Sequence, residues 1–129
     1  MIFDSIGRLI YFNNPYKLIV EIDSEISRYY LSLIPKYIQL NKPKFAPHIS
    51  VVRKEMPNLL YWGKYENQFI DFQYENIIYN DELYYWLNIY SPKLEEIRLE
   101  LGLTNASGIT RAPNGRHRFH TTLGNVKYN

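Results

Sequence analysis

The feature that most restricts the fold of this chain is a series of short runs of β-branched and aromatic residues, interrupted by two segments with helical spacing. Such runs, bounded by turn residues, are typical of strands. They predict strands at 8–12, 17–22, 48–53, 68–74, 76–79, 83–90 and 117–126. Asp23 or Ser24 can cap a first helix that Pro35 ends, and Pro92 opens a second helix that ends at Gly102. This order predicts an α+β domain whose helices pack on the outer faces of antiparallel sheets.

The length and composition agree with a single globular domain over residues 1–129. An aromatic content of 16% argues against a disordered chain. Because the chain has no cysteine, disulfides, zinc–cysteine sites and thiol nucleophiles are excluded. The N-terminus lacks the features of a signal peptide, and no apolar run reaches the roughly 18–20 residues of a membrane span. We therefore expect a cytoplasmic protein with no membrane and no obligate protein partner.

Positive charge is concentrated at the C-terminal end of the chain. Residues 1–100 carry 11 basic and 13 acidic side chains, whereas residues 101–129 carry four basic and no acidic ones. The four basic residues are Arg111, Arg116, Arg118 and Lys127. Such a segment either attracts a phosphate-bearing ligand or is a solvated tail.

Two of the three histidines begin the same local pattern. His-Ile-Ser-Val from position 48 and His-Thr-Thr-Leu from position 120 both read histidine, any residue, hydroxyl residue, apolar residue, and they lie 72 residues apart. On a strand, residues i and i+2 point to the same face. His48 therefore projects with Ser50, and His120 with Thr122. If the two strands lie side by side, all four groups meet at one concave surface.

Two imidazoles and two hydroxyls in one place suit phosphoryl chemistry. An imidazole has an ordinary pKa of about 6.5, so near neutral pH one ring can accept a proton while the other donates one. The hydroxyls can hold non-bridging phosphate oxygens as charge builds on them. This chemistry needs neither a metal nor another cofactor, and the sequence has no convincing carboxylate–histidine cluster for a metal ion.

The paired motifs resemble the two signatures of the 2H phosphoesterase superfamily, which includes 2′-5′ RNA ligase-like proteins and cyclic phosphodiesterases. Residues 33–36, 46–55 and 119–125 are similar to the small phage anti-CBASS nucleases, which degrade the cyclic di- and trinucleotide messengers of a bacterial defence system. The resemblance spans nearly the whole chain. It implies a two-lobed fold with antiparallel sheets around a concave cleft, metal-independent cleavage of 3′-5′ bonds, and action in the host cytoplasm if the protein comes from a phage. Thr121 departs from the apolar residue common at that position.

The resemblance also implies a role for each motif residue. His48 and His120 are the general base and the general acid, in an order that the sequence does not fix, and Ser50 and Thr122 bind the scissile phosphate. The base activates the ribose 2′-hydroxyl of the substrate. The products are a 2′,3′-cyclic phosphate end and a free 5′-hydroxyl.

Candidate substrate-binding residues lie near the motifs. Tyr16 and Trp62 are candidate platforms for base stacking, with core packing as the alternative. Arg118 shares a face with the second motif and is either a phosphate ligand or a solvated charge. Arg53 has the opposite parity from the first histidine and is not expected in the cleft. Residues 104–116 form a polar loop that is either a cover for the ligand or a surface connection.

Three functions stay open on the sequence. The first is a phosphodiesterase that hydrolyses cyclic oligonucleotides. The second is an RNA-end processing enzyme acting on 2′-5′ linkages or 2′,3′-cyclic phosphates, with RNA as its ligand. The third is a nucleotide-binding protein without turnover, which needs the aromatic and basic residues but not both histidines. The modest net charge of +2 favours a compact ligand over long RNA.

Overall fold

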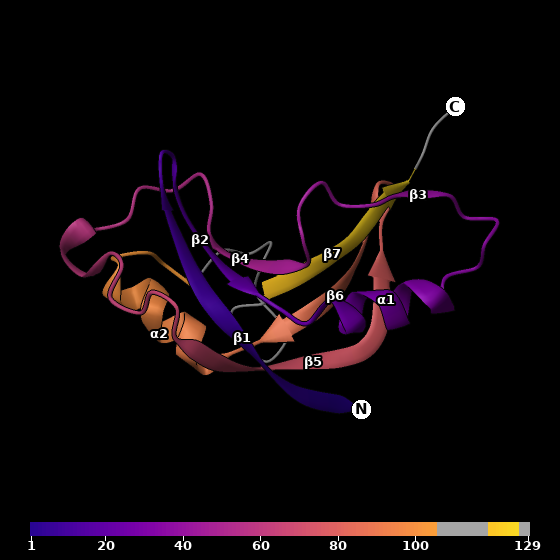
Figure 1. Cartoon of the computed structure of the whole chain (residues 1–129), viewed down its shortest axis with the longest axis horizontal. Helices are drawn as coiled ribbons and strands as arrows, with labels where there is room; N and C mark the ends of the chain where they lie inside the picture. The colour runs from indigo at the N-terminus through magenta and orange to yellow at the C-terminus, as the bar shows by residue number, and fades with distance from the viewer. Residues whose placement is uncertain (106–118, 127–129) are drawn as a thin grey trace.

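The protein is described by a computed structural model, which places residues 1–105 and 119–126 (Figure 1). Within these residues, seven strands form one sheet in the order β3-β7-β6-β5-β1-β2-β4, and each neighbouring pair is antiparallel. The elements in chain order are β1 (Ile2–Asn13), β2 (Tyr16–Glu21), α1 (Ser24–Leu33), β3 (Leu40–Asn41), β4 (His48–Val52), the short 3-10 helix η1 (Leu59–Tyr61), β5 (Phe69–Asn80), β6 (Tyr84–Tyr90), α2 (Pro92–Glu100) and β7 (Phe119–Val126).

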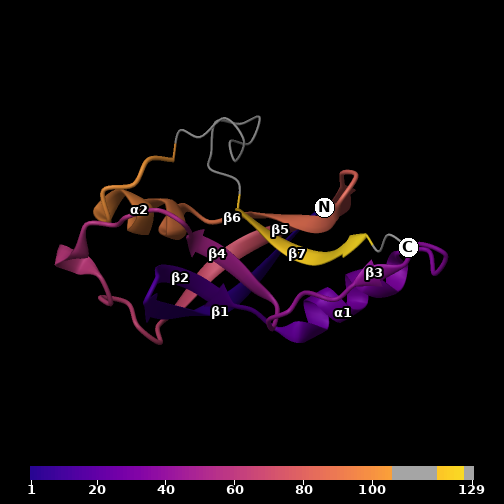
Figure 2. The ribbon, with the colours of Figure 1, turned by 90° about the horizontal axis from the view of Figure 1, so that it is seen from above.

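The sheet is curled. β4 is one edge strand and β7 lies near the other edge, and the two are not neighbours in the hydrogen-bonding order of the described residues. They nevertheless lie side by side, as the two perpendicular views in Figures 1 and 2 both show. The result is a half-barrel in which the two histidine-bearing strands, far apart in the sequence, come together.

One face of the sheet carries the hydrophobic core, and both helices pack against it. Leu94, Ile97 and Leu101 at and just after α2 join a buried cluster with strand residues such as Leu9 and Phe72. Tyr30 of α1 packs in a second cluster, with the strand residues Leu87 and Leu123. The side chains of His48 and His120 point to the opposite face because they alternate with buried neighbours along their strands. The helices therefore lie on the side of the sheet away from the histidines.

The expected α+β class and both helices are confirmed. Asp23 caps α1 by accepting a hydrogen bond from the backbone N–H of Glu25 at 2.9 Å, and Ser91 caps α2. Gly102 follows α2 with a φ of 73°, a conformation that glycine adopts without a steric penalty. The apolar spacing of the second helix matches the face that α2 buries, with Leu94 and Ile97. In α1 the match is partial, because Tyr30 is buried whereas Tyr29 and Leu33 of the same spacing are exposed.

Some strand boundaries differ from the expectation. β1 begins at Ile2 rather than at Arg8, since residues 2–8 pair with β5 although Asp4, Ser5 and Gly7 have little strand propensity. The expected strands 68–74 and 76–79 are one strand, β5, with an irregular register between its two halves. β3, with two residues, was not predicted. Residues 117–118 of the last expected strand lie outside the described residues.

No helix in the described part of the chain has both the length and the apolar composition needed to cross a bilayer.

Candidate active site

The four motif residues line one pocket of about 240 Å³ on the face of the sheet opposite the core. β4 supplies His48 and Ser50, and β7 supplies His120 and Thr122. The pocket is also lined by Lys17 of β2, by Arg53 just after β4, and by the segment from Pro43 to Pro47 that leads into β4. None of the described residues that line it is acidic.

His48 has a defined orientation. It is half-buried, and its Nδ1 lies 2.9 Å from the carbonyl oxygen of Ala46. A carbonyl oxygen can only accept, so Nδ1 carries the proton and donates it to Ala46. In the neutral ring, Nε2 is then the atom with a free lone pair. His48 is thereby prepared to accept a proton at Nε2.

β7 presents the second pair of groups. His120 is exposed and Thr122 is half-buried, whereas Thr121 between them is fully buried. The hydroxyl of Thr121 has no hydrogen-bond partner among the described residues. Thr121 thus takes the place that Ile49 takes in β4, as an anchor on the core side, despite its polar atom.

Each motif is followed by a β-bulge at the same position. In β4 the cross-strand register skips Val51, because Ser50 and Val52 pair with consecutive residues of β2. In β7 it skips Leu123, because Thr122 and Gly124 pair with consecutive residues of β6. Val51 and Leu123 each stand three residues after a motif histidine. The two halves of the site therefore share a backbone irregularity as well as a residue pattern.

The bulge in β4 brings Arg53 into the pocket, which corrects the expectation that it lies outside. A bulge inserts one unpaired residue and so reverses the inside–outside alternation beyond it. Val51 and Val52 are consequently both buried, and Arg53 faces the same side as His48 and Ser50. The sequence signal for this change is the consecutive apolar pair Val51-Val52, which interrupts strict alternation before Arg53.

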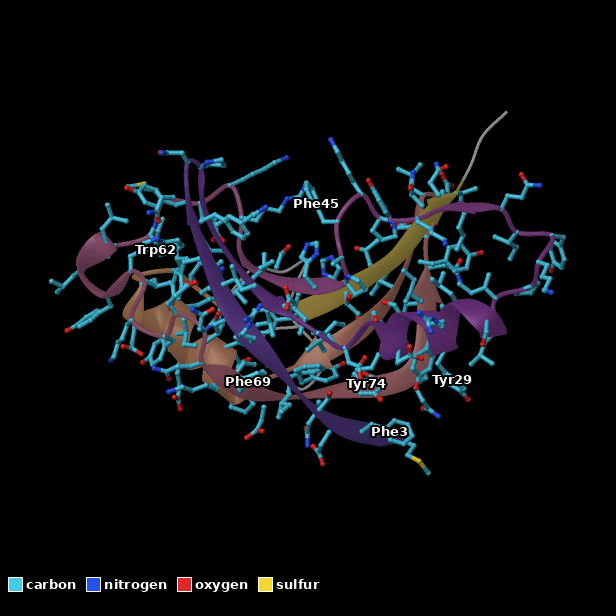
Figure 3. All side chains as sticks on the ribbon, in the orientation of Figure 1. Phe3, Tyr29, Phe45, Trp62, Phe69 and Tyr74 are labelled. Atoms are coloured by element: carbon cyan, nitrogen blue, oxygen red, sulfur yellow. The ribbon has the colours of Figure 1, made fainter. Side chains whose placement is uncertain are left out.

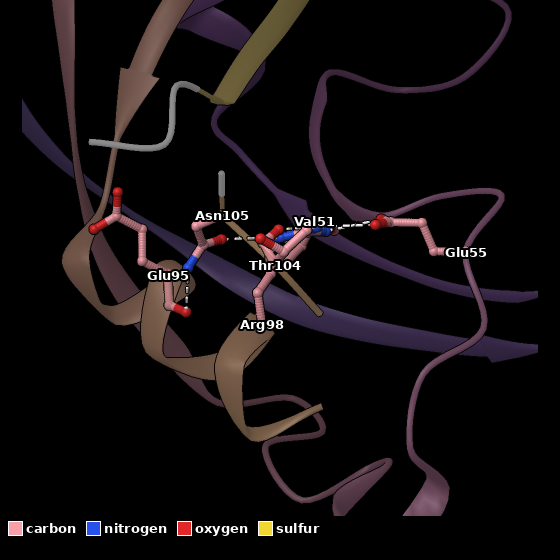
Figure 4. A network of polar contacts seen from close by, with 6 residues as sticks. All are labelled: Val51, Glu55, Glu95, Arg98, Thr104 and Asn105. Carbon is pink, nitrogen blue, oxygen red and sulfur yellow. Dashed lines mark hydrogen bonds and ion pairs between the residues drawn. The ribbon is translucent and has the colours of Figure 1, made fainter. Parts of the chain in front are cut away.

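A buried arginine of α2 holds this irregular segment in place (Figure 4). The side chain of Arg98 is 6% exposed and forms a bidentate ion pair with Glu55, at 2.8 and 2.9 Å. It also donates to the carbonyl oxygens of Val51 at 2.7 Å and Thr104 at 2.8 Å, and its Nε donates to Asn105 at 3.1 Å. Arg98 therefore fastens the bulge of β4, the segment after it and the chain that follows α2.

Lys17 and Phe45 are also among the pocket residues that sequence reasoning missed. The Nζ of Lys17 lies 4.6 Å from the ring centroid of Phe12, its cross-strand partner, and 5.2 Å from that of Phe45. Phe45 is 62% exposed and stands in the loop before β4 (Figure 3). Neither residue carries a local motif. Their place in the pocket depends on strand pairing and on the path of a proline-containing loop.

The predicted stacking residues Tyr16 and Trp62 are not among the pocket-lining residues. Trp62 packs edge-on against Tyr11 and Tyr16, with ring centroids 4.9 and 5.5 Å apart, and its indole N–H donates to Asn13. Trp62 also packs against the hydrophobic core. Core packing, the alternative interpretation, therefore describes Trp62, whereas Tyr16 contacts Trp62 and is not part of either core cluster.

Other expectations fall on parts of the chain that the structure does not describe. Arg118 and residues 106–116 of the expected loop lie outside the described residues, as do Arg111, Arg116 and Lys127 of the basic segment. Within residues 1–105 and 119–126, no three histidine, aspartate or glutamate side chains cluster closely enough to hold a metal ion.

Comparisons with known proteins add no relative. No protein-family model, no curated protein and no solved structure matches this chain, so the site is interpreted from its own residues.

Proposed function

We propose that this protein is a metal-independent phosphodiesterase of the 2H type, a nuclease that hydrolyses the 3′-5′ bonds of cyclic di- and trinucleotide messengers and so counters CBASS immunity. One observation carries the proposal: two His-x-Ser/Thr motifs from distant parts of the chain line a single pocket that also contains Lys17 and Arg53. Paired imidazoles supply an acid and a base, and the cations favour a phosphate ligand.

The orientation of His48 supports the role of base in this proposal. Its Nε2 removes the proton from a ribose 2′-hydroxyl, and the resulting oxygen attacks the neighbouring phosphorus. The bond from phosphorus to the 5′-oxygen breaks, and His120 donates a proton to that leaving oxygen. The products of this transesterification are a 2′,3′-cyclic phosphate and a free 5′-hydroxyl, and hydrolysis is complete when a water molecule attacks the phosphorus and opens the cyclic phosphate to a phosphomonoester. The hydrogen bond from Nδ1 to Ala46 stabilises the cation that His48 becomes.

Ser50 and Thr122 bind the phosphate on which charge develops. Their hydroxyls stand two residues after the histidines on the same strand faces, which places them about 6.6–6.8 Å along each strand. They donate to the non-bridging oxygens while the histidines act on the entering and leaving oxygens. Lys17 and Arg53 add positive charge at the same pocket.

The pocket is small enough that it encloses only part of a nucleotide ligand. About 240 Å³ is less than the roughly 300–1,000 Å³ of pockets that enclose drug-sized ligands. The site therefore receives one phosphodiester and its immediate neighbours, and the remainder of a cyclic oligonucleotide extends along the open face. Such a pocket requires no long basic surface, in agreement with the low net charge.

The proposal is tested by incubating the protein in EDTA with cyclic di- and trinucleotides, linear RNA, a 2′-5′ dinucleotide and a 2′,3′-cyclic mononucleotide. His48→Ala and His120→Ala should each lower the rate of cleavage of the cyclic substrates about 10²- to 10⁴-fold while binding persists. His117→Ala, which removes the histidine outside the motifs, is the matched control and should remain active. Cleavage restricted to 2′-5′ or 2′,3′-cyclic substrates identifies an RNA-end processing enzyme instead. Binding without turnover in the parent protein identifies a nucleotide-binding protein.

A further inference from the structure

We infer that Arg53, Lys17 and Phe45 form a second subsite, distinct from the histidine centre, which binds another phosphate and a base of the same ligand. This inference rests on the proposed function and extends it to substrate selection. It predicts that substrates with two or more phosphates are preferred over those with only the scissile one.

The charges of the pocket support a phosphate at this place. Within the described residues, neither Arg53 nor Lys17 forms an ion pair with a carboxylate. By contrast, the cations that do form ion pairs lie outside the pocket: Arg8, Arg28, Lys64, Lys93 and Arg98. Two cations without carboxylate partners, in a pocket where none of the described lining residues is acidic, favour an anionic ligand.

The backbone around Arg53 has an irregular conformation that specific contacts hold in place. The bulge at Val51 turns Arg53 toward the pocket, and Lys54 follows with a φ of 56°, which is uncommon for a residue other than glycine. The buried Arg98 bonds to the carbonyl of Val51 and to the carboxylate of Glu55. Arg98 therefore contacts the chain two residues before and two residues after Arg53. Irregular backbone that the surrounding structure holds in this way is typical of functional sites.

Phe45 and Lys17 complete the subsite with an aromatic surface. Phe45 is 62% exposed and lines the pocket, and the Nζ atoms of Lys17 and Lys44 lie 5.2 and 6.0 Å from its ring centroid. A nucleobase stacks on this ring by displacing the exposed and more distant Lys44. The ammonium of Lys17 lies against the rings of Phe12 and Phe45, at 4.6 and 5.2 Å from their centroids. Cation–π contact of this kind fixes the position of Lys17 and leaves its hydrogens available for a phosphate.

The position of Arg53 along the strand separates this subsite from the scissile phosphate. Arg53 lies three residues beyond Ser50, with one bulge residue between them, so the two are offset along the strand by roughly 7–10 Å. This offset adds to the roughly 6.6–6.8 Å from His48 to Ser50, so Arg53 is the farthest of the three from the histidine along the strand. A ligand whose scissile phosphate lies between the histidines therefore places a neighbouring phosphate, rather than the same one, toward Arg53.

The experiment compares substrates with one and with several phosphates. A dinucleoside monophosphate NpN has only the scissile phosphate, whereas a cyclic dinucleotide has two. In Arg53→Gln and in Lys17→Gln, kcat/KM for the cyclic dinucleotide should fall about 10- to 100-fold, and that for NpN by less than about 3-fold. Phe45→Ala should raise KM for the cyclic dinucleotide. Lys36→Gln, which removes an exposed charge outside the pocket, is the matched control and should leave both values unchanged.

Two results would overturn the inference. If Arg53→Gln lowers kcat/KM for both substrates equally, Arg53 contacts the scissile phosphate. If the variants match the parent on both, the cations bind no ligand. Should the parent cleave neither substrate, the proposed function fails, and dissociation constants for the same two ligands still decide the subsite. If Arg53→Gln weakens the binding of the cyclic dinucleotide but not that of NpN, the subsite is supported. If it weakens the binding of both ligands equally, or of neither, the subsite is ruled out.

Discussion

Arg98 of α2 donates a hydrogen bond to the carbonyl oxygen of Val51, the unpaired residue of the β4 bulge, at 2.7 Å. A helix on the core side of the sheet thus controls the backbone of a strand whose other face lines the pocket. The same guanidinium binds Glu55, so it holds the chain on both sides of Arg53. Planar guanidinium geometry is well suited to this set of contacts, because its donors lie in one rigid plane.

Arg98→Met should destabilise the protein and disturb the pocket. The substitution leaves the buried carbonyl of Val51 without its guanidinium donor, at a cost of about 1–3 kcal/mol, and also removes the bond to the carbonyl of the exposed Thr104. The free energy of unfolding, measured with urea, should fall accordingly. The rate of cleavage of a two-phosphate substrate should fall even under conditions where the variant is fully folded, because the chain on both sides of Arg53 has lost its contacts with Arg98.

Arg28→Met is the matched control for this change. Arg28 pairs with Glu25 at 2.7 Å, but both side chains are largely exposed, and such pairs contribute about 0–1 kcal/mol. Equal stability losses in the two variants, or full activity in folded Arg98→Met, would show that Arg98 does not position the site.

The fold was predictable where local residue chemistry decides it. Asp23, Pro92 and Gly102 mark helix ends by capping preferences that act within a few residues, and these ends were found. The N-terminal half of β1 was missed because its strand conformation comes from pairing with β5, not from the propensities of Asp4 or Gly7. Pairing between distant segments leaves little trace in a short sequence window.

The same distinction applies to the site. The motif pairs in β4 and β7 could be recognised because strand alternation predicts that residues i and i+2 share a face. The position of Arg53 could not be obtained from alternation alone, because a bulge reverses the parity. Lys17 and Phe45 reach the pocket through a cross-strand pair and a loop. Nearness to the first motif in the sequence makes Trp62 a candidate for base stacking as well as for core packing, and its indole lies against Tyr11 and Tyr16.

Gly7→Ala tests the close packing between β1 and β2. A Cβ at Gly7 would collide with Cγ1 of Val20 and lie 2.8 Å from the carbonyl oxygen of Glu21. Overpacking of this kind costs about 1–3 kcal/mol, which should appear as a lower unfolding midpoint in urea. Ser5→Ala, a change on the same strand that adds no atoms, is the control. An unchanged midpoint in Gly7→Ala would mean that the strands separate without cost.

Asp81 should make stability depend on acid pH. Its carboxylate accepts hydrogen bonds at 2.7 Å from the backbone N–H groups of Tyr84 and Leu83, which lower its pKa from the ordinary value. A carboxyl group whose pKa is lower in the folded state stabilises the fold above its ordinary pKa, and this stabilisation is lost as the pH falls through the lowered value. Asp81→Asn keeps the acceptor oxygen but removes the charge. Its melting temperature should therefore decline less than that of the parent between neutral pH and about pH 3.

Asp4→Asn is the control for the acid measurement. Asp4 accepts a hydrogen bond from the side-chain amide of Gln73 at 3.1 Å and from no backbone group that the structure shows. It should retain the acid dependence of the parent. A parent-like decline in Asp81→Asn would assign the acid sensitivity to other carboxylates.

The hydroxyl of Thr122 should act mainly in the transition state. Thr122→Val keeps the shape of the side chain and removes the donor, so kcat should fall by about 10²- to 10³-fold with KM little changed. Thr122→Ser retains the hydroxyl and should recover most of the activity. Equal rates for the valine and serine variants would show that Thr122 contacts no reacting oxygen. The corresponding Ser50→Ala and Ser50→Thr pair tests the other strand.

The roles of the two histidines should be visible in the dependence of kcat/KM on pH. The parent should give a bell-shaped profile, because the base must be unprotonated and the acid protonated. His48 donates from Nδ1 to Ala46 and therefore offers Nε2 as the base. His48→Ala should remove the rise of activity at low pH, and His120→Ala the decline at high pH, in single-turnover measurements with excess enzyme. If the two variants lose the opposite limbs, His120 is the base and the hydrogen bond to Ala46 instead orients an imidazolium donor.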